Sequence, residues 1–524
     1  MAGNQKSRSM SRRKFLGTSA AGISSVAFSS ALIEMLLSGT GCKSGLKQGL
    51  EGLIISEDIL RKAVDFLMDK GADFGDVFVE RAATDAVMSD DRKINTFTTI
   101  EKGVGFRAVK DGKTFYAYTD SFEPEQIYAT ARYVADAASL AGGGETSVIS
   151  LTVQSSNLSF PITPLPSEVA VEKKIQFFQA LTDRAWSAAP RIVQAMEFMR
   201  EIIRQVNIAT SSGKIVNQTY GLTEIMSQIF MKDPQGGLQA AMDMRGAYAG
   251  RDFFTGENSF ETVVDKSVEK AKRLLEAVDS PRGVFPVVLG PGMNGVLFHE
   301  SCGHGMEADL VFKGSNFKDQ IGKQTAAKGV TLIDDGTIPQ FPGSYAFDDE
   351  GTPSEKTVLI EDGIQRNYLC DLVWGKKLGL KSTGNGRRQS FRYPPIPRMR
   401  NTYIEKGTIP PEEIIASTKR GIYVGDVSGG GQVDVITGNF MMGVGEGYLI
   451  EGGKITRPIK GATLSGMGIQ ALKTIDMVGS DLKMFPSAGR CGKLQSAAVG
   501  FGMPTIRVRG ILVGGKGEAW EDKG

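Results

Sequence analysis

The 524-residue chain has only two histidines, four cysteines and three tryptophans. The cysteines, at positions 42, 302, 370 and 491, are too few and too scattered for a disulfide scaffold, which excludes the small disulfide-stabilised class of secreted domains. A formal net charge of +2 leaves no basic excess, so no nucleic-acid partner is expected. A chain of this length exceeds what one hydrophobic core serves, and two or three domains are therefore predicted.

The first 42 residues read as a targeting segment. Arg12 and Arg13 precede a mildly apolar run rich in alanine, serine and glycine, a pattern typical of twin-arginine export signals. A spanning helix is disfavoured because the run is short and contains Glu34. Export to the periplasm or cell envelope is expected, or a cytoplasmic location if the signal does not function. A lipid anchor at Cys42 is a further possibility left open by the preceding Ser-Gly-Thr-Gly.

The remaining chain predicts an α+β fold in which helical and strand patterns form successive units. Residues 54–141 form a small N-terminal α/β unit with a hairpin turn at 110–113, and the glycine-, serine- and proline-rich 142–166 form a linker. A central α+β domain is expected over 167–280. The last domain, 284–515, is predicted to be glycine-rich and predominantly β, with a helix over 293–310.

Both histidines lie in one heptapeptide, FHESCGH, with Glu300 directly after His299. His299 and His304 are five positions apart, so a regular helix would place their side chains about 140° from each other. A π-bulge, which inserts one residue into a helical turn, would bring them onto a common face, and Gly303 would ease that distortion. A distorted helix that binds a metal would explain this spacing, and the alternative is two capping or core histidines.

Zinc suits two imidazoles, with a third protein ligand and one open position at a catalytic site. The candidates for the third ligand are Glu307, Asp309, Cys302 and Cys491, and Cys302 is poorly aimed because it lies between the histidines on another side of the helix. Local spacing leaves Glu307 and Cys491 as alternatives. Glu300 would be the general base that takes a proton from water.

Two other stretches carry weaker signals. The glycine-rich residues 428–434 favour a structural turn over a strand edge that accepts substrate backbone. Residues 384–400 hold five arginines, which favours a loop that lines a peptide cleft or pairs with the acids of 348–351. Arg387, in this region, and Asn401, directly after it, are candidates for orienting a substrate.

The C-terminal half resembles the TldD/PmbA family of metallopeptidases through several long strings in order. These include LFHESCGHGMEADLV, IDDGTIPQFPGSYAFDDEGTP, STGNGRRQSF, SGGGQVDVITGNF and GRCGK. The resemblance implies that His299, His304 and Cys491 bind zinc and that Glu300 is the catalytic base. Because the metal motif is complete, the chain resembles the catalytic TldD-like branch and not the metal-free PmbA-like branch.

The resemblance also implies a function. Family members form dimers, so a homodimer or a heterodimer with a metal-free PmbA-like subunit is expected, as is hydrolysis of flexible or unfolded peptides bound as an added strand. Alternatives are a metal-loaded, non-hydrolytic peptide-binding subunit or chaperone, and a zinc hydrolase of another amide or ester. Two features depart from the pattern: the residues after GRCGK are one position shorter, and the export signal is unusual.

Overall fold

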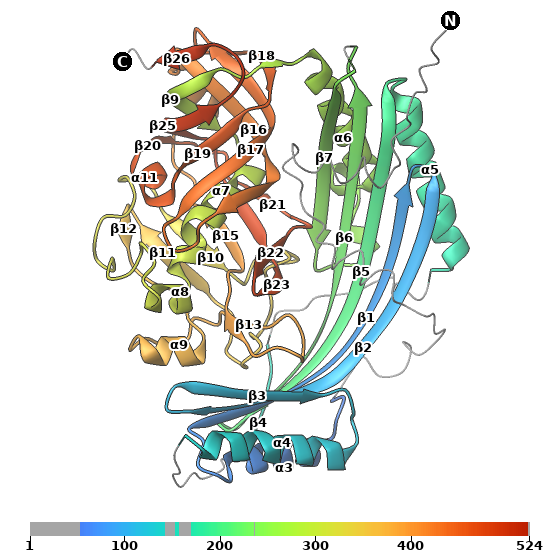
Figure 1. The fold of residues 1–524 in the computed structure, drawn as a ribbon, viewed down its shortest axis with the longest axis vertical. Coiled ribbons are helices and arrows are strands. Elements are labelled where there is room, and N and C mark those ends of the chain that lie inside the picture. Colours follow the sequence, from blue (N-terminus) through green and yellow to red (C-terminus); the bar gives the residue numbers. More distant parts are fainter. Residues whose placement is uncertain (1–52, 142–151, 157–168, 235, 522–524) are drawn as a thin grey trace, which may run out of the picture.

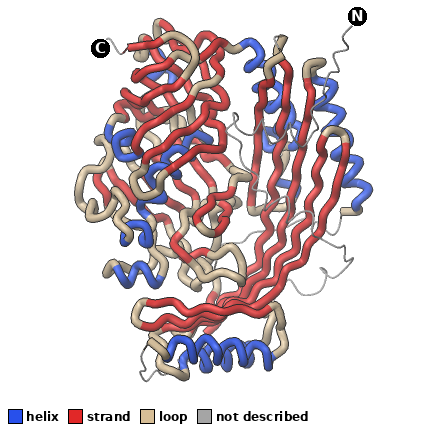
Figure 2. The backbone as a smooth tube through the Cα atoms, viewed as in Figure 1, coloured by secondary structure: helices blue, strands red, loops and turns tan. Residues whose placement is uncertain are grey.

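A large curved sheet and a more compact β-rich part stand side by side, with a small helical layer at one end (Figure 1). The structure is a computed structural model that describes residues 53–141, 152–156, 169–234 and 236–521. Strands dominate these residues, with helices at the periphery of the sheets (Figure 2). The predicted α+β class is confirmed.

The helices of the described residues are mostly short. They are α3 (Glu57–Met68), α4 (Pro124–Ser139), α5 (Val171–Ala188), α6 (Phe260–Glu276), α7 (Val296–Phe298), α8 (Ala308–Phe312), α9 (Leu372–Lys377), α10 (Pro411–Ala416) and α11 (Gly468–Lys473). None of the helices in the described ranges is both long and apolar enough to cross a membrane.

The large sheet has seven strands in the order β3-β2-β1-β5-β6-β4, and β7 also pairs with β6. The strands are β1 (Phe74–Asp90), β2 (Lys93–Lys110), β3 (Lys113–Thr119), β4 (Thr152–Gln154), β5 (Ile192–Thr210), β6 (Lys214–Lys232) and β7 (Leu238–Ala247). The predicted turn at 110–113 joins β2 to β3, where Asp111 and Gly112 adopt positive φ. A second tight turn joins β1 to β2 through Asp91 and Arg92, both also at positive φ.

The N-terminal and central segments share this one sheet. β1, from the first segment, pairs antiparallel with β5 of the second over fifteen residue pairs between Asp76 and Asp90. Within the predicted linker, Thr152–Gln154 pairs with the edge of β6 as strand β4, so this piece is not purely a connection. Residues 142–151 and 157–166 of the predicted linker, and the predicted signal segment 1–42 with Cys42, lie outside the described residues.

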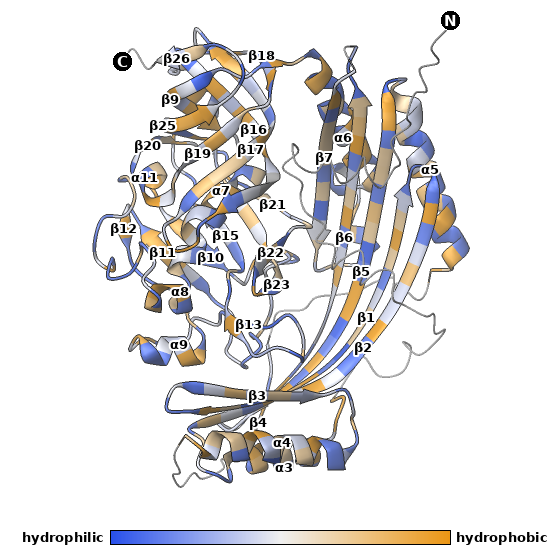
Figure 3. Ribbon diagram, in the orientation of Figure 1, coloured by the Kyte–Doolittle hydropathy of each residue, from blue (hydrophilic) through white to orange (hydrophobic). Residues whose placement is uncertain are grey.

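The two faces of the large sheet have different partners. Helices α5 and α6 cover one face around Phe178, Val264 and Ile229, and α3 and α4 pack beneath it at the curved lower end (Figure 1). Hydrophobic and hydrophilic residues alternate along the long strands (Figure 3), as expected when one face is covered by helices and the other is polar. The polar face turns toward the C-terminal part of the chain.

The C-terminal part contains two main sheets. One has nine strands: seven follow the order β16-β9-β25-β19-β17-β18-β8, while β20 pairs with β25 and β26 pairs with β9. An additional pairing of β16 with β17 closes five of them into a ring. Its strands are β8 (Val278–Asp279), β9 (Arg282–Leu289), β16 (Arg420–Val433), β17 (Asn439–Glu451), β18 (Lys454–Lys460), β19 (Thr463–Met467), β20 (Ile475–Val478), β25 (Ile506–Gly514) and β26 (Ala519–Glu521). The glycine-rich 428–434 mostly continues β16.

The other main sheet has six strands, in the order β12-β11-β10-β15-β24-β21. These are β10 (Leu332–Asp335), β11 (Lys356–Glu361), β12 (Ile364–Gln365), β15 (Asn401–Ile404), β21 (Lys483–Phe485) and β24 (Gly500–Met503). Two small pairs complete the fold: β13 (Gly386–Arg387) with β14 (Ile396–Pro397), and β22 (Arg490–Lys493) with β23 (Gln495–Ala498). The histidine segment lies between the two main sheets and packs into their common core.

Candidate metal centre

The histidine segment is helical but irregular. A 3-10 turn (Met293–Gly295) leads into α7, a π-helical turn follows over His299–Gly303, and a second 3-10 turn (His304–Met306) precedes α8. The π-bulge predicted from the spacing of the histidines is therefore present. Gly303 serves a different purpose from the one predicted: its φ of −57° suits any residue, but a Cβ there would lie 2.1 Å from Met399 Sδ. Close packing, not backbone freedom, requires the glycine.

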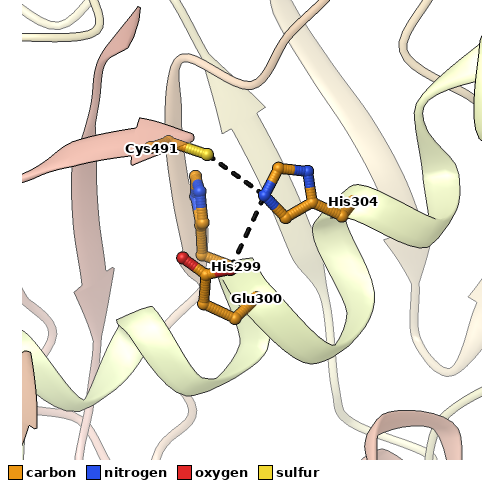
Figure 4. A group of neighbouring side chains, drawn as sticks. All are labelled: His299, Glu300, His304 and Cys491. Carbon is orange, nitrogen blue, oxygen red and sulfur yellow. Dashed lines mark hydrogen bonds and ion pairs between the residues drawn. The ribbon is translucent and has the colours of Figure 1, made fainter. Parts of the chain in front are cut away.

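Four side chains converge where this segment meets the β22–β23 hairpin (Figure 4). One potential ligand atom from each of His299, Glu300, His304 and Cys491 lies within 4.8 Å of the others. Cys491 Sγ is 3.1 Å from His304 Nε2, and Glu300 Oε2 is 3.6 Å from the same nitrogen. Both imidazoles and the thiol are buried, whereas the Glu300 side chain is 28% exposed, so the carboxylate is the member of the group that solvent reaches.

Glu307 orients His304 from the opposite side. Its Oε2 lies 2.8 Å from His304 Nδ1, so the imidazole donates there and directs Nε2 toward Cys491. The same carboxylate accepts a hydrogen bond from the backbone N–H of Met399 at 3.2 Å. A carboxylate on the far nitrogen of a histidine is the arrangement that fixes tautomer and ring direction at metal sites. Glu307 therefore lies where a residue that orients a metal-binding histidine, without binding the metal itself, is expected.

The β22–β23 hairpin is held against the histidine segment by two buried cations. Lys493 Nζ lies 2.9 Å from Glu307 Oε2 and 2.8 Å from Asp309 Oδ1. Arg398 donates to the carbonyl oxygen of Cys491 at 2.6 Å. Lys493 and Cys491 point to the same side because they are two residues apart on a strand. That alternation was the only sequence signal for Lys493, and the sequence-based prediction did not include it.

The β22–β23 hairpin turns through a single residue. Lys493 pairs directly with Gln495, which leaves Leu494 alone at the tip with φ of +60° and 90% exposed. A left-handed conformation costs a non-glycine residue about 1–2 kcal/mol. Cys491 lies two pairs further along the ladder from this tip and contacts His304.

Charges in the cluster stabilise one another. Burial alone would raise the pKa of Cys491, but the positive charges of His304 and Arg398 outweigh it and hold that pKa well below its ordinary value. Burial would lower the pKa of His304, yet the Cys491 thiolate and Glu307 raise it well above 6.5. Burial, and then the charge of Cys491, raise the pKa of Glu300. A thiolate beside a proton-accepting carboxylate is thus favoured.

The donor set fits a metal ion. Neither ring nitrogen of the buried His299 has a hydrogen-bond partner among the described residues, although a buried polar group of this kind normally has one. A metal would satisfy a nitrogen of His299 together with His304 Nε2 and the Cys491 thiolate. Two imidazole nitrogens and one thiolate form a set typical of catalytic zinc with one position left open.

The other candidates from the sequence lie elsewhere. Cys302 is fully buried outside the cluster, and burial raises the pKa of its thiol to about 12. Asp309 pairs with Lys493. Asn401 is buried and holds the backbone of Gly343 and Asp335, which is a structural role. Arg387 lines a cavity on the far side of the Cys491 hairpin.

Comparison with known proteins identifies the class. Three family models match successive parts of the chain: domain 1 of the PmbA/TldA metallopeptidases over residues 75–141, their central domain over 164–275 and their C-terminal domain over 282–515. Because these matches cover most of the chain, it belongs to the PmbA/TldD family of metallopeptidases, as the sequence motifs indicated. Relatives named metalloproteases, together with the cluster of His299, Glu300, His304 and Cys491, imply a metal cofactor.

Individual relatives point to the TldD branch. A Haemophilus influenzae protein named metalloprotease TldD homolog is 34% identical over 469 residues, which are 88% of this chain and 97% of that protein. A Saccharolobus solfataricus protein named zinc metalloprotease TldD homolog is 25% identical and covers 85% of this chain and 97% of its own. The fold resembles crystalline TldE from Thermococcus kodakarensis, with a TM-score of 0.68 and 21% identity over 87% of this chain and 99% of that one.

Proposed function

We propose that the chain is a zinc-dependent peptidase in which His299, His304 and Cys491 hold the metal and Glu300 is the catalytic base. The observation that supports this most directly is the convergence of these four side chains from segments 187 residues apart, within 4.8 Å of one another. Zinc agrees with the donor set and with the printed name of the Saccharolobus solfataricus relative. The chain would then belong to the catalytic branch.

Each side chain would have a distinct task. A bound zinc ion supplies a Lewis acid and lowers the pKa of water to near 7. Glu300, the partly exposed member of the group, takes a proton from the attacking water and delivers it to the amine nitrogen of the leaving peptide. Burial and the charge of Cys491 raise the pKa of Glu300, which favours its acceptance of a proton. Glu307 holds His304 in place.

The substrate we propose is an extended or unfolded peptide. Open strand edges in the C-terminal sheets offer backbone pairing, which recognises a chain without strong dependence on its side chains. We also propose export through the twin-arginine segment 1–42, with Cys42 as a possible lipid attachment point, and a dimer formed with a second copy or with a metal-free PmbA-like subunit. These assignments rest on the sequence motifs and the family.

Elemental analysis together with a proteolysis assay tests the proposal. The purified chain should contain one zinc per chain and should degrade an unfolded casein-type substrate, and a chelator should abolish the activity. Glu300→Gln should keep the zinc and lose the activity, while Cys491→Ser should lose the zinc. Zinc-loaded protein that leaves unfolded substrates intact would refute the peptidase assignment, and full zinc content in Cys491→Ser would refute the ligand assignment.

A further inference from the structure

A cavity of about 500 Å³ lies between the large sheet and the C-terminal part of the chain. Its floor is the polar face of four long strands, to which β1, β2, β5 and β6 contribute every second residue. Its roof is formed by residues 345–349 and 387–393 and by the β22–β23 hairpin. The volume falls within the range of ligand pockets, which is about 300–1,000 Å³.

The hairpin that carries Cys491 separates this cavity from the metal centre. None of the four clustered side chains lines the cavity, but Arg490 does. Arg490 and Cys491 are consecutive strand residues, so their side chains point to opposite faces of the hairpin. The part of a ligand that lies in the cavity would thus contact the residue next to the proposed metal ligand without itself touching the metal.

Positive charge exceeds negative charge at the hairpin end of the cavity. Arg200 and Arg490 both contact the single carboxylate of Glu224, at 2.6 Å from Arg200 Nε and at 3.4 Å from Arg490 Nη2. Burial would raise the pKa of Glu224, but these two arginines lower it, so Glu224 carries one negative charge against their two positive ones.

Arg387 adds a third cation, and it has no acidic partner. The residue is 7% exposed and donates to the carbonyl oxygen of Met399 at 2.6 Å, while its guanidinium lies 5.3 Å from the ring centroid of Tyr345. Among the described residues no carboxylate lies within ion-pair distance of Arg387. Arg387 and Arg490 both line the cavity, as do Arg204 and the acidic Asp349.

We propose that this end of the cavity binds a carboxylate of the peptide substrate through Arg387 and Arg490. A buried guanidinium without an acid is costly unless a ligand supplies the opposite charge. The planar fork of arginine matches a carboxylate with two parallel hydrogen bonds. The rest of the lining, which includes Phe97, Ile202 and Leu222, gives apolar room for the peptide attached to that carboxylate.

The inference rests on the proposed function, because it takes the ligand to be a peptide substrate. It adds that a group remote from the cleaved bond anchors the substrate, which allows binding energy gained there to position the chain for reaction. Either the carboxyl terminus or an acidic side chain of the peptide would supply the same chemistry.

Calorimetric titration with four matched peptides distinguishes these sources. Glu300→Gln protein would be used to prevent cleavage. The first pair of peptides is one with a free carboxyl terminus and the same peptide with an amidated terminus. The second pair has amidated termini and differs only in an internal glutamate or glutamine. The expected result is about 10–100-fold tighter binding of one carboxylate peptide than of its neutral counterpart, the usual range for charged hydrogen bonds. The member of the series that shows the preference identifies the source.

Substitutions in the cavity then test which residues cause the preference for a carboxylate. Arg387→Gln and Arg490→Gln, each added to the same background, should remove most of it, whereas Arg457→Gln, a matched change at an exposed arginine, should leave it intact. Equal binding of all four peptides would overturn the inference without any variant, as would absence of measurable binding. A preference that survives both cavity variants, or that disappears in Arg457→Gln, would also overturn it.

The cavity assignment and the proposed peptidase function can fail independently of each other. Cleavage of the same peptides by the chain with its native Glu300, without carboxylate preference, would overturn the cavity assignment and leave the peptidase proposal intact. A clear carboxylate preference in a chain that cleaves none of the peptides would overturn the peptidase proposal and leave the cavity assignment intact.

Discussion

Replacement of Glu307 by glutamine tests how the metal centre is assembled. The side chain is fully buried, and its Oε2 lies 2.8 Å from His304 Nδ1 and 2.9 Å from Lys493 Nζ. Glutamine has nearly the same size, so packing is retained while the negative charge between two donors is lost. Lys493 keeps Asp309 as a partner, and the hairpin should therefore stay in place.

The expected effect is a weakened site that still binds metal. Loss of a carboxylate that orients a ligating histidine lowers metal affinity about 10–100-fold, equivalent to about 1.4–2.7 kcal/mol. Cys491→Ser removes a ligand and should leave no stoichiometric metal. Cys302→Ser makes the same chemical change at a buried thiol outside the cluster and should bind zinc like the native chain.

Competition with a chelator of known affinity measures these differences, and circular dichroism checks that each variant is folded. Unchanged affinity in Glu307→Gln would refute the orienting role. Complete loss of metal from folded Glu307→Gln, with metal retained in Cys491→Ser, would mean that Glu307 is itself the third ligand and that the contact with His304 Nδ1 forms only in the absence of metal.

Three further predictions concern catalysis, packing and pH. Glu300→Gln should reduce the proteolytic rate about 10²–10⁴-fold with zinc content unchanged, measured as turnover of an unfolded substrate. Gly303→Ala should destabilise the chain by about 1–3 kcal/mol in urea unfolding, because its Cβ would lie 2.1 Å from Met399 Sδ, whereas Gly510→Ala, with 3.5 Å to its nearest neighbour, should be nearly neutral. Burial raises the pKa of Glu197 from 4.5 to about 7, so the unfolded state releases its proton first and stability falls as the pH rises between these values. The free energy of unfolding of Glu197→Gln should lack this decline, so that between pH 4.5 and 7 it rises by about 3 kcal/mol relative to that of the native chain. If the two free energies change in parallel with pH, the raised pKa of Glu197 is refuted.

Local signals in the sequence predicted much of the site. The five-residue offset of His299 and His304 required a distorted helix if both were to bind one ion, and the structure has a π-helical turn there. The turn at 110–113 also follows from its turn residues, because Asp111 and Gly112 adopt positive φ there. These features depend on neighbours in sequence.

Features that depend on distant pairing could not be predicted in the same way. From spacing alone Glu307 and Cys491 were equivalent, because only the tertiary fold brings Cys491 across 187 residues and turns Glu307 to the far nitrogen of His304. The tight turn at Asp91 and Arg92 lacks the glycine that marks such turns, so the full length of β1 and β2 was missed. Lys493 gave no signal of its own, since a buried lysine becomes recognisable only through its partners.

The pairing of β1 with β5 also determines which parts of the chain can exist alone. A fragment that ended near residue 141 would expose fifteen residues of unpaired strand edge, which is a ready template for self-association. The first two segments should therefore unfold as a single cooperative unit, with hydrogen exchange of β1 and β5 amides at one common rate. In this protein the modules apparent along the sequence are not the units of folding.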